Sequence, residues 1–157
     1  MNVSPRGAIF KTAVIALLLT LLPMPSWLTV VWPEFLVLTV FYWSIQAPWS
    51  GGIGLGWIAG LLLDGFQGPV LGEHALAVAL VAYLGVREHQ RIRTKPLVQQ
   101  SLIVLAVLLL YEFVLFAIDG WSGHPLTTLL RWVPAVTGAL AWPAVASILS
   151  RTYRPRD

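Results

Sequence analysis

The chain of 157 residues has the length of one soluble domain, but its composition excludes a soluble protein. Hydrophobic residues make up 57% of it and charged residues only 11%, whereas a soluble domain carries roughly 25% charged residues. Ten basic and seven acidic side chains cannot cover a surface that faces water, so lipid must be the solvent for most of the protein. The sequence has no cysteine, which excludes disulfides, thiolate metal sites and a cysteine nucleophile.

Six apolar segments predict an all-α membrane protein, a bundle of six transmembrane helices in one integral membrane domain of residues 1–157. A span uses about 20 residues, so six spans leave no room for a folded domain outside the bilayer. Proline disfavours helix in the residue before it, so Pro23 and Pro48 end the first two segments. Pro33 suits the first turn of the second helix, while Pro134 and Pro143 predict kinks in the sixth. The predicted spans are about residues 8–22, 27–47, 51–66, 72–86, 97–118 and 126–150.

Two of these segments leave alternatives open. The third and fourth are short, and they are either short spans, as we expect, or a broken pair joined by the turn at residues 67–71. The first could instead be a signal peptide. Lys11 interrupts its apolar run and residues 23–26 (PMPS) offer no cleavage site between small residues, which favours a retained helix.

The basic residues predict the orientation, because Lys and Arg in short loops stay on the cytoplasmic side. With six spans, both termini and the loop between the fourth and fifth segments share one side. That side holds nine basic and two acidic residues, and the other holds one basic and five acidic residues. Both termini are therefore expected in the cytoplasm of a multi-pass membrane protein.

Glu112 and Arg131 are predicted to form an ion pair within the membrane. An ionisable side chain inside a span is costly unless it is paired. Counted along the fifth and sixth segments, each residue lies about 7 Å inside the outer boundary of the apolar core. The alternative is that each side chain extends separately to the outer interface. A charge swap would test the pairing, because the double exchange should restore what the single exchanges lose.

Gly52, Gly56 and Gly60 recur at intervals of four, which places three glycines on one helix face where another backbone can approach closely. The spacing does not say whether the neighbour belongs to the same chain, the simpler alternative, or to another protein.

The segment from Asp64 to His74 is the densest polar constellation, with Gly68, Gly72 and Glu73 between them. A carboxylate near the free amides of a helix start locks a turn, which is the structural interpretation. The functional interpretation is a polar patch on the outer face. The segment is a poor candidate for catalysis, since it offers one carboxylate and one histidine but no nucleophile positioned beside them. Adjacent residues on a helix point apart, so we expect no metal site here and no cofactor.

Arg87, Arg91, Arg93 and Lys95 form a basic cytoplasmic loop between the fourth and fifth segments. Such a loop sets topology and attracts anionic lipid, and a partner protein could also dock there. Nucleic-acid binding is not expected, because the patch is short and has no interleaved aromatic residues.

Several runs resemble the rod shape-determining protein MreD family, and the resemblance covers nearly the whole chain. The most specific run joins GLLLD to LGEHAL; the loop at residues 46–50 departs from the family by lacking a basic residue. The matching runs are residues 56–64 (GWIAGLLLD), 71–77 (LGEHALA), 81–84 (VAYL), 89–93 (HQRIR), 132–135 (WVPA) and 142–143 (WP).

The resemblance implies a non-enzymatic scaffold of the bacterial elongation machinery in the cytoplasmic membrane. It implies association with MreC, a single-span protein, and coupling of MreB filaments to RodA and its partner transpeptidase. It also implies a helical arrangement similar to the substrate-binding subunits of energy-coupling-factor vitamin transporters, although fold does not establish function. We expect the MreC helix to pack on a small-residue surface that includes Gly56, with the corner of Asp64 and His74 shaping the outer end or touching MreC.

Two other classes of function remain as alternatives. The chain could be a small-molecule binding subunit of a transporter, whose first segment would dock a coupling subunit through Ala8, Thr12, Ala16 and Thr20. The outer polar residues are few for binding a hydrophilic vitamin. A membrane enzyme lacks a convincing set of acid, base and nucleophile.

Overall fold

The computed structural model describes residues 5–68, 70–123 and 129–153, and the regular structure within these residues is entirely helical. The elements in chain order are α1 (Pro5–Thr20), α2 (Ser26–Thr29), α3 (Phe35–Gln46), α4 (Ile53–Gln67), α5 (Glu73–Arg93), α6 (Leu97–Trp121), the 3₁₀ turn η1 (Leu129–Trp132) and α7 (Val133–Thr152).

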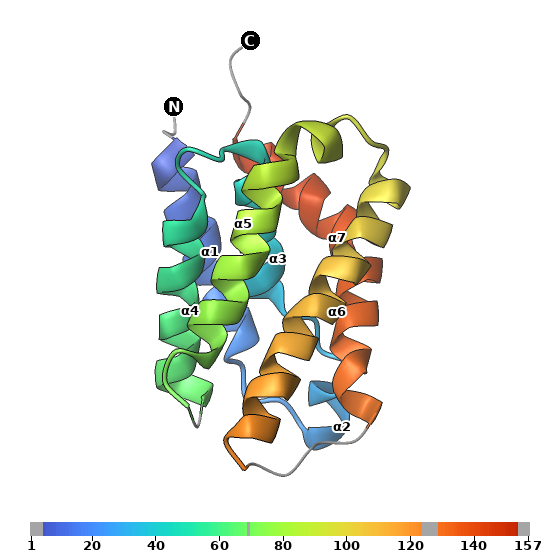
Figure 1. Cartoon of the computed structure of the whole chain (residues 1–157). Coiled ribbons are helices and arrows are strands. Elements are labelled where there is room, and N and C mark those ends of the chain that lie inside the picture. The colour runs from blue at the N-terminus through green and yellow to red at the C-terminus, as the bar shows by residue number, and fades with distance from the viewer. Residues whose placement is uncertain (1–4, 69, 124–128, 154–157) are drawn as a thin grey trace.

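The longer helices run alternately up and down the molecule, so both chain ends lie at the same end (Figure 1). The connection from α5 to α6 lies at that end too, while α2 and the turn from α4 to α5 lie at the opposite end. α4 packs along α5, α6 packs on α7 and α5, and α3 contacts four of the other helices.

The second predicted span is wrong as a single helix. Residues 27–47 form the short α2, a non-helical connection and then α3, which has only 12 residues. Pro33 lies two residues before α3 rather than in its first turn, because it restricts the backbone before it and donates no hydrogen bond. At 1.5 Å per residue α3 is roughly 18 Å long, well short of the ~30 Å apolar core of a bilayer.

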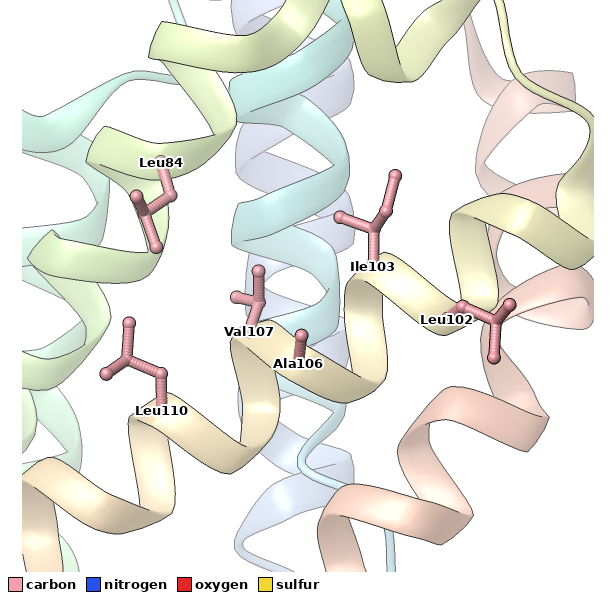
Figure 2. A pocket seen from close by; sticks show the side chains of 6 residues that line it. All are labelled: Leu84, Leu102, Ile103, Ala106, Val107 and Leu110. Atoms are coloured by element: carbon pink, nitrogen blue, oxygen red, sulfur yellow. The ribbon is translucent and has the colours of Figure 1, made fainter.

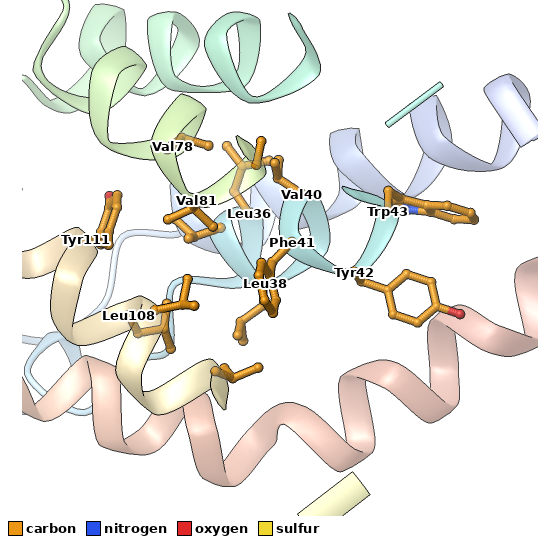
Figure 3. Close-up of a cluster of buried hydrophobic side chains, with 14 of the residues drawn as sticks. Leu36, Leu38, Val40, Phe41, Tyr42, Trp43, Val78, Val81, Leu108 and Tyr111 are labelled. Atoms are coloured by element: carbon orange, nitrogen blue, oxygen red, sulfur yellow. The ribbon is translucent and has the colours of Figure 1, made fainter. Parts of the chain in front are cut away.

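Helix α3 forms the centre of the protein. Every residue from Leu36 to Ile45 is buried. Figure 3 shows side chains of α3 beside Val78 and Val81 of α5 and Leu108 and Tyr111 of α6. A helix that is apolar on all sides is buried on all sides, as this one is.

Polar side chains tie α3 to α1. The indole nitrogen of Trp43 donates to Thr12 Oγ1 at 2.8 Å, and that hydroxyl donates to the carbonyl of Ala8 at 2.8 Å. Ala8, Thr12 and Ala16 are buried. The small-residue face of α1 therefore packs inside the protein. The transporter interpretation requires this face to be free to dock a coupling subunit, and it is not.

The neighbour that the glycines approach is α5 of the same chain. A Cβ on Gly56 would lie 2.8 Å from Ala82 Cβ, and one on Gly60 would fall on the backbone of Ala75. Gly52 caps α4, where a Cβ would lie 2.8 Å from the carbonyl oxygen of Pro48. The glycine face expected to receive an MreC helix is therefore occupied by α5 of the same chain at Gly56 and Gly60.

Two of the described helical segments, Leu97–Trp121 and Leu129–Thr152, are long and apolar enough to cross a membrane. The apolar helices α3 and α4 are shorter. Pro134 lies in the first turn of α7, directly after η1, where its missing N–H costs nothing, and Pro143 lies inside the helix.

Replacing Gly60 with alanine should weaken the packing of α4 on α5. The added methyl group meets backbone rather than a flexible side chain, so we expect a loss of about 1–3 kcal/mol in unfolding free energy. Thermal unfolding of the detergent-solubilised protein measures it. The matched control is Gly54→Ala on the same helix, where a Cβ meets nothing within 4 Å and removal of glycine should be neutral or stabilising. Equal unfolding midpoints for the two variants would contradict the close approach.

Candidate functional site

The ionisable residues divide between the two ends of the bundle. Helix α5 begins at Glu73 and ends at Arg93, and α6 runs back so that Asp119 lies near Glu73. We call the end with the α4–α5 turn, Asp64, Glu73, Glu112 and Asp119 the acidic end. The opposite end, with Arg87, Arg91, Arg93 and Lys95, is the basic end (Figure 1).

Asp64 joins the end of α4 to the start of α5. Its Oδ2 accepts hydrogen bonds from the backbone N–H of Gly72 at 2.9 Å and of Ala75 at 3.2 Å. Its Oδ1 accepts from the backbone N–H of His74 at 2.8 Å and contacts the ring Nδ1 of the same residue at 3.0 Å. The side chain is fully buried. Asp64 thus caps α5 from a neighbouring helix and stabilises the positive end of its dipole.

The turn between the two helices fits around this carboxylate. Gly72 has a φ of +98°, which favours glycine. A Cβ on Gly68 would lie 3.1 Å from Asp64 Oδ1. Both oxygens of Asp64 are engaged by α5, so the corner has the geometry of a structural lock, without a carboxylate oxygen placed to act on a substrate.

Arg131 lies between two carboxylates of α6. Its Nε donates to Glu112 Oε2 at 3.4 Å, and its Nη1 donates to Asp119 Oδ2 at 2.6 Å. The Phe116 ring, from the turn between the two acids, lies 6.0 Å from the guanidinium carbon. All three charged side chains are at most one-sixth exposed. The structure thus brings together the two residues that sequence depth matched, and adds a third.

Asp119 was missed by the sequence argument, although a signal was available. Asp119 is seven residues after Glu112, two turns along the same face of α6. Its presence changes the meaning of a charge swap, because a glutamate at position 131 would face Asp119. Failure of the swapped pair to recover would therefore be no evidence against the contact of Glu112 with Arg131.

Glu73 takes no part in the lock that holds its neighbour His74. It is 4% exposed and its carboxyl group lies beside that of Asp119. Its Oε2 has no hydrogen-bond partner in the part of the chain that the structure describes. The rings of His74 and Tyr111, 6.5 Å apart, link the corner to α6 next to Glu112.

The basic segment is mostly helical, so its prediction as a loop is wrong. α5 continues to Arg93, two turns beyond the predicted span end at residue 86. Glu88 lies 3.7 Å from Arg87 and 3.2 Å from Arg91, in exposed pairs that contribute little stability. The four basic side chains are exposed at this end of the molecule.

The surface of the described residues includes the following hollows. A groove of about 390 Å³ between α5 and α6 is lined by apolar side chains. A second, of about 460 Å³, lies at the acidic end beside Glu112, Asp119 and Arg131. A third, of about 200 Å³, lies between α1, α3 and α7 and is also apolar. The described residues contain no group of three His, Asp or Glu side chains that could hold a metal ion.

In the ranges that the structure describes, these observations define an all-helical protein with two helices long and apolar enough to cross a membrane. The family model for rod shape-determining protein MreD matches residues 6–150. The rod shape-determining protein MreD of Haemophilus influenzae is 31% identical over 145 residues, which cover 90% of this chain and 87% of that protein. The chain therefore belongs to the MreD family. No solved structure matches it.

Replacing Asp64 with alanine should destabilise the acidic end of α4 and α5. Three N–H groups of the α5 start lose their acceptor, and each unsatisfied buried group costs about 1–3 kcal/mol. We expect a loss of about 3 kcal/mol or more in unfolding free energy, and a smaller loss for Asp64→Asn, which keeps one acceptor oxygen. Thermal unfolding checks this. The control is Glu88→Ala, an exposed acid of α5; a loss as large as that of Asp64→Ala would show that removal of any carboxylate suffices.

Neutralising Arg131 should cost more than neutralising either acid. Arg131→Gln leaves the buried Glu112 and the half-buried Asp119 without their cation, for which about 3 kcal/mol is expected, the low end of the cost of breaking a buried pair. Glu112→Gln and Asp119→Asn each leave Arg131 paired with the other acid, so each should lose less. Unfolding midpoints of the three variants in one detergent rank them. A milder effect for Arg131→Gln than for both acid variants would contradict the arrangement.

Proposed function

We propose that this chain is a non-enzymatic scaffold of the bacterial cytoplasmic membrane that supports rod shape and lateral peptidoglycan synthesis by holding the membrane helix of MreC. Membership of the MreD family supports the role in rod shape. The six helices α1, α3, α4, α5, α6 and α7 would cross the membrane, with the short α3 and α4 completed by their connecting segments. This arrangement would be similar to that of the substrate-binding subunits of energy-coupling-factor transporters.

The separation of charge supports the proposed orientation. The basic end carries both chain ends and the exposed arginines of α5, which belong in the cytoplasm by the distribution of Lys and Arg in short loops (Figure 1). The acidic end then faces outward. At the basic end, the α5 arginines would contact anionic lipid or MreB.

The groove between α5 and α6 is the observation that carries the proposal. Figure 2 shows Leu84 of α5 across from Val107 and Leu110 of α6, with Ala106 and Ile103 along the same wall. The lining is almost wholly apolar. Lipid competes for such a surface, so a partner helix is held by shape and close contact rather than by hydrophobicity. A concave strip along a helix long enough to cross the membrane meets that need.

An enzymatic role has less support. The oxygens of Asp64 are occupied by backbone amides, and Arg131 is shared by two acids. The buried hydroxyls of Thr12 and Ser44 donate to main-chain carbonyl oxygens. The binding of RodA and its transpeptidase partner would follow from the MreC complex, as the family resemblance implies.

Ala106→Trp should weaken the recovery of MreC with this chain. The indole would fill the groove from its α6 wall, while the exposed position of Ala106 spares the core. Co-purification of the two proteins from native membranes, normalised to the amount of this chain, measures the effect; a reduction of about tenfold corresponds to roughly 1.4 kcal/mol of lost contact.

The matched control is Leu140→Trp, an exposed apolar residue of α7 outside the groove. It should leave the recovery of MreC unchanged. Unchanged recovery with Ala106→Trp in a protein of normal thermal stability would place the MreC helix elsewhere. An equivalent block of the α1, α3 and α7 hollow, through Ile15→Trp, would then be the next site to examine.

A further inference from the structure

The hollow at the acidic end combines charged and apolar walls. Glu112, Asp119 and Arg131 line one part of it. Thr29, the last residue of α2, and Val30 after it line another part. Leu130 and Pro134, on either side of Arg131 in sequence, line the rest. A polar pocket with apolar sides fits a small charged group attached to an apolar body.

The charge of this hollow favours a cation. Arg131 serves Glu112 and Asp119 together, and Glu73 lies beside Asp119 as a third carboxyl group. Glu34, before α3, acts electrostatically on Glu112 as well. Glu73 does not line the hollow itself, but its buried Oε2, with no partner in the described ranges, adds an unsatisfied carboxyl oxygen behind Asp119. Buried carboxylates in excess of their cations are stabilised by a donor that carries positive charge.

The surroundings of the hollow favour a lipid as the source of that cation. Leu129 is 86% exposed, Trp121 is 97% exposed, and both lie beside the hollow in sequence. Exposed tryptophan at a helix end is typical of the membrane–water interface, where headgroups lie. A headgroup ammonium is present at that interface without any protein partner, and its acyl chains would lie along the apolar surface of α6 and α7.

We propose that the acidic-end hollow binds the primary ammonium of an aminophospholipid, of which phosphatidylethanolamine is the probe. The ammonium donates hydrogen bonds to the carboxylates of Glu112 and Asp119, while Val30, Leu130 and Pro134 pack against the headgroup carbons. A primary ammonium has three N–H donors, which a quaternary choline lacks. The site therefore distinguishes phosphatidylethanolamine from phosphatidylcholine by hydrogen bonding, in addition to its preference for a positively charged headgroup. This proposal is independent of where MreC docks.

The test measures which lipids stay with the protein. The full chain is reconstituted into vesicles of equal parts phosphatidylethanolamine, phosphatidylglycerol and phosphatidylcholine, re-extracted in mild detergent, and its retained lipids are quantified. We expect phosphatidylethanolamine to exceed each of the others about fivefold. Free ethanolamine in excess should reduce that enrichment if the headgroup alone is recognised; no reduction would overturn recognition through the ammonium.

Lysine variants test the site by supplying a competing ammonium group from the protein itself. Leu130→Lys places an ammonium in the hollow without removing any existing ion pair, and Thr29→Lys does so from the opposite wall. Both should bring the retained lipids to the vesicle ratio. Leu129→Lys is the matched control, because this neighbour of Leu130 does not line the hollow and should keep the wild-type enrichment.

Two outcomes overturn the proposal. The first is a wild-type protein that retains the three lipids in the vesicle ratio, or lysine variants that keep the wild-type enrichment. The second is a zero-length carbodiimide cross-link that joins Asp119 to a lysine of a protein in native membranes, without enrichment of phosphatidylethanolamine. The occupant would then be a protein side chain.

Discussion

Close approach between helices holds this protein together, because lipid solvates apolar side chains nearly as well as a protein core does. The structure meets that constraint with glycine. Gly56 and Gly60 let α4 lie against the backbone of α5, and Gly85 lets α5 lie against Ser44 of α3. Polar side chains add direction, as in the bonds from Trp43 to Thr12 and from Trp142 to Gln100. The apolar surfaces left over, including the groove between α5 and α6, are then free for other helices or lipid.

The acidic end shows two different uses of a buried carboxylate. Asp64 has its oxygens turned to the backbone of α5, so it stabilises one geometry of the corner. The acids around Arg131 are less completely satisfied, because one guanidinium is shared and Glu73 keeps an oxygen without a donor among the described residues. The corner is therefore held in one geometry, while the cluster beside it keeps a carboxyl oxygen that lacks a donor among the described residues.

The sequence predicted some of the contacts at the acidic end and missed others. Depth counting along two sequential helices brought Glu112 and Arg131 together, since rise per residue is nearly constant in a helix. It missed Asp119, whose spacing from Glu112 placed it on the same face. It grouped Glu73 with Asp64 and His74 because they are close in sequence, yet successive residues on a helix point to different neighbours. It also treated residues 27–47 as one helix, although Pro33 interrupts them.

The sequence by itself determined that the protein is helical, that it has segments apolar enough to cross a membrane, and that its charges divide between two ends, because composition and hydrophobic run length act locally along the chain. Family membership also followed from residue runs alone. Only the tertiary structure decided which partner each glycine face and carboxylate has. It placed α5 on the glycines and Arg131 between two acids, and it left a groove between α5 and α6, because contacts between helices depend on rotation and crossing geometry that no single segment encodes.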